Sequence, residues 1–189
     1  MRKIVCLGDS LTQGYLIEST ESWVHLLNRE FNSKFVNYGI SGDTTTGMLI
    51  RLQQILKDEK PDMIILLGGT NDLSFGISDA LILSNFLAIT RHAKQYQTKV
   101  ILGIPTPIFY DEDNSQEFVF LTLKEHAKRV EKFSKTLQEF AKEDHQQIID
   151  FSVNMTENLF LEDGIHPSKE GHQQMKENVK NFLIENFKL

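Results

Sequence analysis

The feature that most constrains the fold is a repeated alternation of short apolar runs with longer segments of helical periodicity. Five runs predict β-strands: Lys3–Leu7, Lys34–Tyr38, Met63–Leu67, Lys99–Gly103 and Gln147–Phe151. They are almost continuously apolar, which is typical of strands covered on both faces. Apolar residues recur at helical spacing in five other segments: Trp23–Phe31, Met48–Leu56, Leu81–Tyr96, Leu123–Ala141 and Met175–Phe187. Strand and helix alternation with right-handed crossovers predicts an α/β fold, a three-layer α/β/α sandwich around a five-stranded parallel sheet.

The size and composition favour a single soluble domain spanning residues 1–189. The chain has 189 residues, of which 40% are hydrophobic and 24% charged, with four prolines. No internal repeat, low-complexity tract or Pro/Gly/Ser linker divides it. The formal net charge of −6 argues against nucleic-acid binding, which requires a basic surface. The one cysteine, Cys6, cannot form an internal disulfide and falls at a position expected to face the core.

Localisation is predicted from what the chain lacks. No run of 18 apolar residues is present to span a membrane, so we expect no integral membrane segment. The first predicted strand starts at Lys3, which leaves no room for a signal peptide, so the expected location is cytoplasmic. The sequence leaves open whether the protein forms a homo-oligomer.

Small and reactive residues gather where the predicted strands end. The first strand is followed by Gly8-Asp9-Ser10, the second by Ser41-Gly42-Asp43, the third by Gly69-Thr70-Asn71-Asp72, and Asp163-Gly164-Ile165-His166 lies beyond the fifth. The carboxyl ends of parallel strands meet at one edge of a sheet, where ligands bind in open α/β folds. The sequence therefore predicts a functional site at this edge.

Nucleophilic catalysis is one chemistry that this edge could perform. A serine hydroxyl such as that of Ser10 needs a nearby base to take its proton, and histidine fits that role. His166 lies at a chain turn, three residues after Asp163, so the carboxylate could reach its Nδ1 and leave Nε2 free. Five other histidines, at positions 25, 92, 126, 145 and 172, lie in helical patterns and are predicted to be partly exposed. Spacing alone leaves open that Asp163 only caps a turn and that His166 is an ordinary loop residue.

Acyl transfer also needs hydrogen-bond donors aimed at the developing oxyanion. Gly42 could supply a backbone N–H from a strand-to-helix turn, and Asn71 could supply its side-chain amide. Each residue has a purely structural alternative, since Gly42 could serve only a tight turn and Asn71 with Asp72 could cap the following segment.

The irregular stretch from residue 104 to about 117 is longer than an ordinary βα connection, and is a candidate lid or binding loop. An acidic solvated loop is the alternative for Asp111–Asn114. Four apolar residues could form a substrate-binding wall near the serine, although packing is the more common role of such residues: Leu11, Ile108, Phe109 and Tyr110.

The four blocks, in this order, resemble the signature of the GDSL esterases and lipases, also called SGNH hydrolases. They read GDSL at 8–11, SGDT at 41–44, GTND at 69–72 and DGIH at 163–166. Their spacing covers nearly the whole chain, which is far more specific than an isolated GDSL. Within the family, the IPTP and DGIHPS stretches make the chain most similar to the small single-domain type represented by bacterial acyl-CoA thioesterase I/lysophospholipase L1.

The resemblance implies a flavodoxin-like SGNH hydrolase fold and a role for each matched residue. Ser10 would be the nucleophile, His166 the base and Asp163 its orienting acid. The oxyanion hole would consist of the backbone N–H groups of Ser10 and Gly42 and the amide of Asn71. The implied substrate is a small-molecule ester or thioester, cleaved through an acyl-enzyme without a metal or other cofactor.

Alternative functions differ in how well the sequence supports them. A carbohydrate O-acetylesterase of the same family is the main rival, because the acyl pocket is not legible from sequence. A flavodoxin-like phosphate-binding module is disfavoured because the chain has neither GxxxxGK[ST] nor GxGxxG after a strand. An α/β-hydrolase is disfavoured because Ser10 is not in a Gly-x-Ser-x-Gly elbow. A metal hydrolase is disfavoured because Asp163 and His166 have no obvious third ligand.

Overall fold

The structure is a computed structural model that describes residues 1–111, 117–118 and 120–187. Five parallel strands form one sheet in the order β2-β1-β3-β4-β7. Their bounds are Lys3–Gly8 (β1), Lys34–Gly39 (β2), Met63–Leu67 (β3), Lys99–Ile104 (β4) and Gln147–Asp150 (β7). The predicted five-stranded parallel sheet is confirmed, and each strand ends within one residue of its predicted end.

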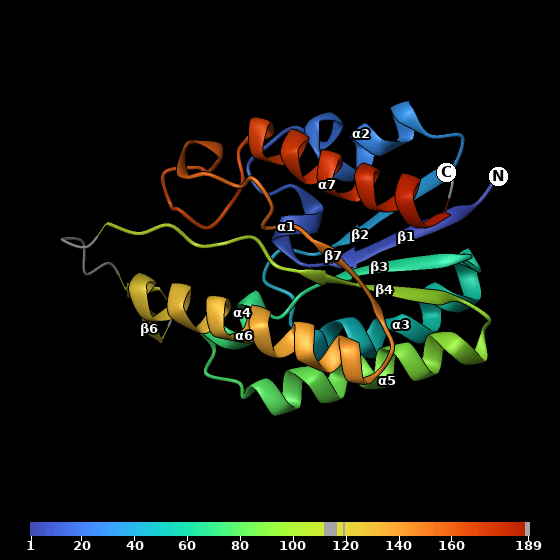
Figure 1. The fold of residues 1–189 in the computed structure, drawn as a ribbon, viewed down its shortest axis with the longest axis horizontal. Helices are drawn as coiled ribbons and strands as arrows, with labels where there is room; N and C mark the ends of the chain where they lie inside the picture. The colour runs from blue at the N-terminus through green and yellow to red at the C-terminus, as the bar shows by residue number, and fades with distance from the viewer. Residues whose placement is uncertain (112–116, 119, 188–189) are drawn as a thin grey trace.

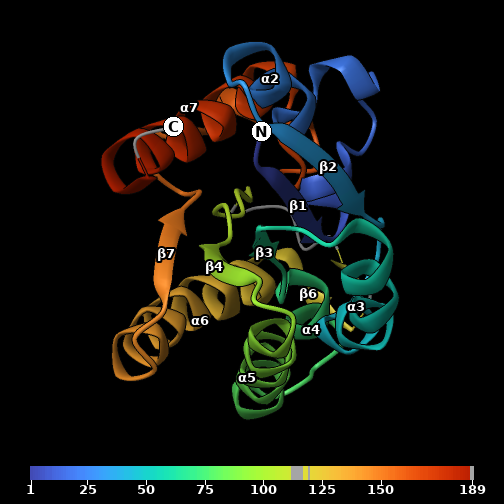
Figure 2. The same cartoon turned by 90° about the vertical axis from the view of Figure 1, so that its right-hand side faces the viewer.

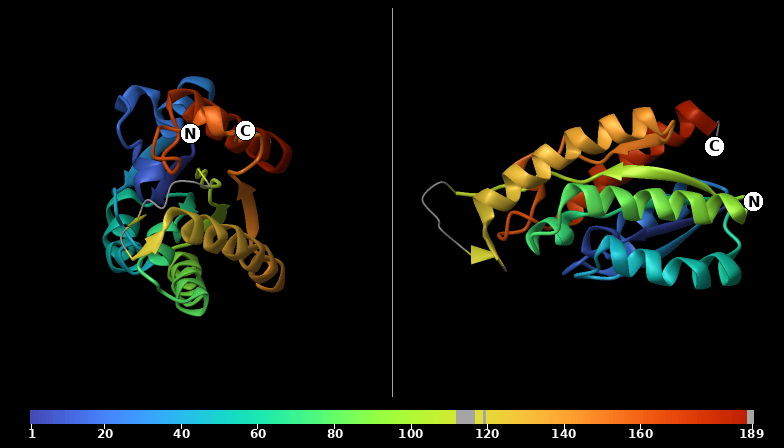
Figure 3. Two further views of the ribbon diagram at one scale, coloured as in Figure 1. Left: turned by 90° about the vertical axis from the view of Figure 1, so that its left-hand side faces the viewer. Right: turned by 90° about the horizontal axis from the view of Figure 1, so that it is seen from below.

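Helices cover both faces of the sheet and complete the predicted three layers. Figures 1 and 2 show α2 (Trp23–Glu30) and α7 (Lys169–Phe187) on one face. The other face carries α3 (Thr45–Glu59), α5 (Asp79–Gln95) and α6 (Leu123–Glu143), which lie next to one another in the right panel of Figure 3. The sandwich therefore encloses the sheet, which is why its central strands are apolar on both sides.

Side-chain caps explain where several helices begin. Ser22, Thr44 and Ser78 each accept a hydrogen bond from a backbone N–H three residues ahead, at the starts of α2, α3 and α5. Thr122 and Glu125 form a reciprocal capping box at the start of α6. Helix α7 starts at Lys169, before the predicted Met175, because its first turn is polar and gives no apolar periodicity.

The shortest elements of the fold were not predicted from the sequence. These are α1 (Ser10–Gln13), α4 (Thr70–Ser74), two 3₁₀ turns (Ser19–Glu21 and Glu157–Leu159) and a hairpin of β5 (Glu117–Phe118) with β6 (Leu121–Thr122). Elements of two to five residues are too short to show a hydrophobic period. Two of them, α1 and α4, directly follow β1 and β3, at the edge of the sheet where a site is predicted.

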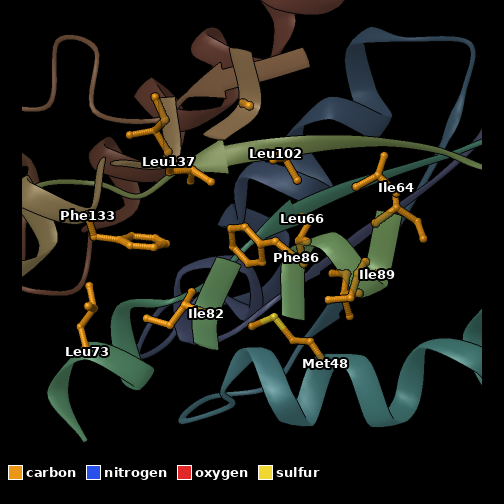
Figure 4. Close-up of a cluster of buried hydrophobic side chains, with 14 of the residues drawn as sticks. Met48, Ile64, Leu66, Leu73, Ile82, Phe86, Ile89, Leu102, Phe133 and Leu137 are labelled. Carbon is orange, nitrogen blue, oxygen red and sulfur yellow. The ribbon is translucent and has the colours of Figure 1, made fainter. Parts of the chain in front are cut away.

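Alternate residues of β1 pack into two separate clusters. Val5 and Leu7 belong to the cluster with α3, α5 and α6, whereas Ile4 and Cys6 belong to the cluster with α2 and α7. Cys6 is fully buried, as predicted. Figure 4 shows the first cluster. Met48 of α3, Phe86 of α5 and Phe133 of α6 lie there on the side of the sheet that carries Ile64, Leu66 and Leu102.

Coverage on both faces does not extend to the whole of β2. Lys34 and Asn37 are exposed there, because β2 is an edge strand that pairs only with β1. At the carboxyl ends of the strands, the order of the sheet reverses between β1 and β3, since the chain continues from β1 to one side and from β3 to the other. This switch point is where open α/β sheets bind ligands.

Candidate active site

Ser10 stands at the first position of α1, two residues after the last residue of β1. Asp9 is the N-cap of this helix, and its Oδ1 accepts a hydrogen bond from the backbone N–H of Leu11 at 3.0 Å. Gly14 ends the helix in the left-handed conformation. The strand therefore stops and turns within two residues, and the Ser10 side chain reaches the edge of the sheet, where 8% of the residue is exposed.

Asp163 and His166 lie in a turn between Phe160 and Pro167, which are joined by an isolated β-bridge. Asp163 Oδ1 accepts hydrogen bonds from the backbone N–H groups of Ile165 and His166, both at 2.9 Å. Asp163 Oδ2 is 2.5 Å from His166 Nδ1. The spacing of three residues thus brings carboxylate and imidazole together in a turn outside any helix.

This turn contacts Ser10, which lies 156 residues before His166 in the sequence. His166 Nε2 lies 3.0 Å from Ser10 Oγ. Because Nδ1 faces a carboxylate, the neutral ring carries its proton there and presents Nε2 as the acceptor for the serine hydroxyl. The Tyr15 ring packs on the imidazole, with ring centroids 4.5 Å apart.

The pKa of Asp163 reflects this arrangement. Partial burial by itself raises the pKa, but hydrogen bonds from the His166 ring and from the backbone N–H groups of His166 and Ile165 outweigh burial and lower it below its usual range. The carboxyl therefore stays ionised and can stabilise a positive charge on the imidazole.

A backbone contact from the long loop after β4 braces the turn. The Phe109 N–H donates to the Gly164 carbonyl at 2.9 Å, and the Phe109 ring packs edge-on against Phe160. Gly164 has a φ of +67°, and a Cβ atom there would lie 2.0 Å from the Phe109 carbonyl oxygen. The glycine of the DGIH block is therefore required by a close approach, which sequence reasoning did not identify.

Gly42 and Asn71 face Ser10 from the next two strand ends. Gly42 has a φ of +80° in a turn closed by a hydrogen bond from the Asp43 N–H to the Ile40 carbonyl at 3.0 Å. Asn71 donates one Nδ2–H to the Asp43 carbonyl at 3.0 Å. Since the amide carries two hydrogens, this bond fixes its plane and leaves a second donor.

The structure supports the purely structural alternative for Gly42 but not the capping alternative for Asn71 and Asp72. Gly42 does lie in a tight turn, and this position does not exclude a role as a hydrogen-bond donor. The N-cap of α4 is Gly69, so Asn71 and Asp72 do not cap that helix. Asp72 is instead buried and accepts hydrogen bonds from the Thr45 N–H and hydroxyl, at 2.9 and 2.6 Å.

The described residues leave a cavity of about 180 Å³ at this edge. It is lined by residues from the ends of β1, β2 and β3 and from the turn at 163–166: Ser10, Tyr15, Ser41, Gly42, Thr70, Asn71, Ile165 and His166. One concave site thus contains the serine, the histidine and both candidate oxyanion donors.

The four apolar residues expected to form a wall near the serine do not line this cavity. Leu11 and Ile108 are buried in the two core clusters. Phe109 braces the 163–166 turn, while Ile108 and Tyr110 line a different cavity of about 490 Å³ against α6. Packing accounts for Leu11 and Phe109, and a substrate-binding role for Ile108 and Tyr110 stays a prediction. Asp111 is exposed, while residues 112–114 of the predicted acidic loop and the 112–116 part of the candidate lid lie outside the described residues.

Two histidines predicted to be partly exposed are buried instead. The Nε2 atom of His126 lies 2.9 Å from the Thr70 carbonyl, and His172 Nδ1 accepts a hydrogen bond from the Trp23 N–H at 3.4 Å. Burial lowers the pKa of His126, and burial together with the nearby His166 lowers that of His172 to about 4. These helix faces meet other elements, which helical spacing alone does not reveal.

The residues that the structure describes contain neither a metal-binding cluster nor a membrane-spanning helix. No group of three histidine, cysteine, aspartate or glutamate side chains there could hold a metal ion. None of the helices there combines the length and the apolar character needed to cross a membrane.

A parallel α/β/α sandwich with a hydrogen-bonded serine, histidine and aspartate at its switch point has the architecture of a serine hydrolase. Within that class the chain belongs to the GDSL-like lipase/acylhydrolase family, whose model matches residues 6–174. This match confirms the resemblance of the four sequence blocks.

Relatives and solved structures agree with this assignment. The chain is 27% identical to Esterase TesA of Pseudomonas aeruginosa over 93% of this chain and 85% of that protein. It is 28% identical to the thioesterase 1/protease 1/lysophospholipase L1 of Escherichia coli over 88% of this chain and 76% of that protein. The crystal structure of a lipase/acylhydrolase from Enterococcus faecalis matches with a TM-score of 0.79 and 27% identity, covering 97% of this chain and 95% of that one.

Proposed function

We propose that this chain is a serine hydrolase that cleaves small carboxylic esters or thioesters through an acyl-enzyme. The observation that carries the proposal is the continuous hydrogen-bonded chain from Ser10 Oγ through His166 to Asp163, at 3.0 and 2.5 Å. The esterase and thioesterase names of its relatives support the same chemistry.

In the first half of the reaction, Ser10 Oγ attacks the acyl carbon while His166 Nε2 takes its proton. Asp163 stabilises the resulting imidazolium and keeps the ring oriented. The oxyanion receives hydrogen bonds from the backbone N–H groups of Ser10 and Gly42 and from the second Nδ2–H of Asn71, each such donor being worth about 3 to 4 kcal/mol in the transition state. The imidazolium then protonates the departing alkoxide or thiolate, which leaves an ester between Ser10 Oγ and the acyl group.

In the second half, water attacks this ester. His166 takes a proton from the water and returns it to Ser10 Oγ as the carboxylic acid leaves, so the enzyme is regenerated. Apart from the attacking water, each step uses only groups that line the cavity and the Asp163 carboxylate behind His166.

The cavity favours short acyl groups. Its volume of about 180 Å³ is below the range of about 300–1,000 Å³ that encloses drug-sized ligands. A compact acyl group fits inside, whereas a longer chain has to extend over the surface. The same small volume supports a carbohydrate O-acetylesterase as the second candidate.

Replacement of the serine tests the reaction class. Ser10→Ala is expected to lower the turnover of p-nitrophenyl butyrate by at least about 10³-fold and to abolish labelling by a fluorophosphonate. Ser19→Ala, at an exposed serine in a 3₁₀ turn, is the matched control and is expected to keep both the turnover and the labelling of the parent. Turnover by the Ser10→Ala protein within a few-fold of the parent would refute the proposal.

A panel of acyl donors tests the substrate. Esters with acyl chains of 2 to about 12 carbons and acetylated sugars are compared, with the Ser10→Ala protein as the blank. A decline in kcat/KM beyond the shortest acyl chains is expected from the cavity volume. Selective turnover of acetylated sugars over p-nitrophenyl acetate would favour the second candidate.

A further inference from the structure

Arg51 of α3 connects three separate segments near the site. Its Nε and Nη2 atoms contact Asp43 Oδ2 at 2.9 and 2.8 Å, its Nη1 donates to the Tyr38 carbonyl at 2.8 Å, and its Nη2 donates to the Gly8 carbonyl at 3.0 Å. The Arg51 and Asp43 side chains are only 19% and 12% exposed. An ion pair with this little exposure is screened less than a surface pair.

The three partners of Arg51 are the segments that carry the site. Gly8 ends β1, two residues before Ser10, and Tyr38 is the penultimate residue of β2. Asp43 directly follows Gly42. A planar guanidinium with five donors can hold all three in one fixed geometry, which a lysine ammonium on a flexible stem cannot do.

Asp43 extends this contact to the second oxyanion donor. Its carboxylate binds Arg51, while its backbone carbonyl accepts the hydrogen bond that fixes the Asn71 amide. Its backbone N–H closes the turn on Ile40. A displacement of Asp43 therefore moves Gly42 and reorients Asn71 at the same time.

We propose that Arg51 is a positioning residue that sets the oxyanion hole. It does not line the cavity, so it acts through the peptide of Gly42, the amide of Asn71 and the backbone at Gly8 that leads to Ser10. This inference rests on the proposed function, because it assigns Arg51 a role in the transition state of that reaction. Removal of Arg51 is expected to lower kcat much more than it raises KM, since oxyanion contacts form in the transition state.

The chain offers a matched control. Arg91 of α5 also forms an ion pair with an aspartate, Asp144, but this pair lies beside the start of β4 and β7, at the opposite edge of the sheet. Arg91→Met and Arg51→Met each remove one arginine–aspartate pair. Only the second removes contacts to the site.

The first measurement compares kcat and KM for p-nitrophenyl butyrate, with thermal unfolding as the check on folding. Arg51→Met is expected to lower kcat by about 100-fold, the effect of a misplacement of about 1 Å, and Arg51→Lys to recover only part of the loss. Arg91→Met is expected to leave both constants close to the parent. If Arg51→Met does not fold, Arg51→Lys, which keeps the charge, carries the comparison. Variants of Arg51 that lose no more kcat than Arg91→Met would overturn the inference.

A double-mutant cycle separates positioning from general stability. If Arg51 acts through the oxyanion donors, one of which is Asn71, Arg51→Met has a smaller effect on kcat in an Asn71→Ala background than in the parent. Fully additive losses would overturn the inference. Retention of activity by Ser10→Ala would instead defeat the proposed function, so the two failures are distinct.

Discussion

The turns that carry Ser10 and His166 are built on the same local motif but treat their aspartates in opposite ways. In both, one carboxylate oxygen accepts the backbone N–H two residues ahead: Asp9 from Leu11 and Asp163 from Ile165. The second oxygen of Asp163 receives the His166 ring, whereas that of Asp9 is buried without a hydrogen-bond partner among the described residues.

Deeper burial of Asp9 and the different second contact together explain the different pKa values. The pKa of Asp163 is lowered because hydrogen bonds outweigh its partial burial. Burial raises the pKa of Asp9 to about 7, against the lowering effects of the Leu11 N–H and of His166, while Asp72 and Asp43 raise it further. In this motif, the depth of burial and the contact of the second oxygen together decide whether the aspartate is a charged partner or a buried acid.

The largest expected effect is a loss of kcat when the carboxylate of Asp163 is replaced. In Asp163→Asn, the amide oxygen stays on the two backbone N–H groups, so the NH₂ faces His166 Nδ1. The ring is then held in the tautomer that carries its proton on Nε2 and cannot accept the proton of Ser10. We expect kcat for p-nitrophenyl butyrate to fall by about 10³- to 10⁴-fold.

The matched control is the same change in the other turn. Asp9→Asn alters a carboxyl that does not hydrogen-bond His166, so its kcat is expected to fall far less. If the two variants lost activity to the same degree, the distinction between the two aspartates would be wrong.

The next effect concerns stability and belongs to Asp9. Its pKa of about 7 in the folded protein lies above the ordinary value of 3.8, so the folded state holds the proton more tightly than the unfolded chain. The contribution of protonated Asp9 to the free energy of unfolding is therefore full below pH 3.8 and is lost as the pH rises through about 7. We expect the loss to be on the order of 3 to 4 kcal/mol between those limits.

Denaturant unfolding of the parent and of Asp9→Asn at several pH values measures this pH-dependent contribution of Asp9 to stability. The free energy of unfolding of the parent should fall relative to the variant between pH 4 and 8, because the amide does not titrate. A difference between the two proteins that stayed constant over this range would contradict the raised pKa.

Some features of the fold and of the site could be predicted from residue spacing along the chain, and others could not. The strands and the contact between Asp163 and His166 could be predicted, because both depend on residues close in sequence. The roles of Arg51 and of buried His126 could not, since the partners of Arg51 lie 8, 13 and 43 residues away and that of His126 lies 56 residues away. Such contacts arise only when the helices pack on the sheet, and nothing in a helical period identifies the atoms they will meet.

The smallest expected difference between matched variants tests how the turn of Asp163 is braced. Gly164→Ala combines a φ of +67° with a Cβ atom 2.0 Å from the Phe109 carbonyl oxygen, so the loop after β4 has to move. Gly76→Ala is the matched control, because Gly76 has a similar φ of +78° but nothing within 4 Å of its Cβ position. The control should lose about 1 to 2 kcal/mol of stability from backbone strain alone, and Gly164→Ala about 1 to 3 kcal/mol more from the steric overlap. Only Gly164→Ala should also lower kcat, since it displaces the segment that holds Asp163 and His166. Equal losses of stability in the two variants, with kcat unchanged, would show that Phe109 does not brace the turn.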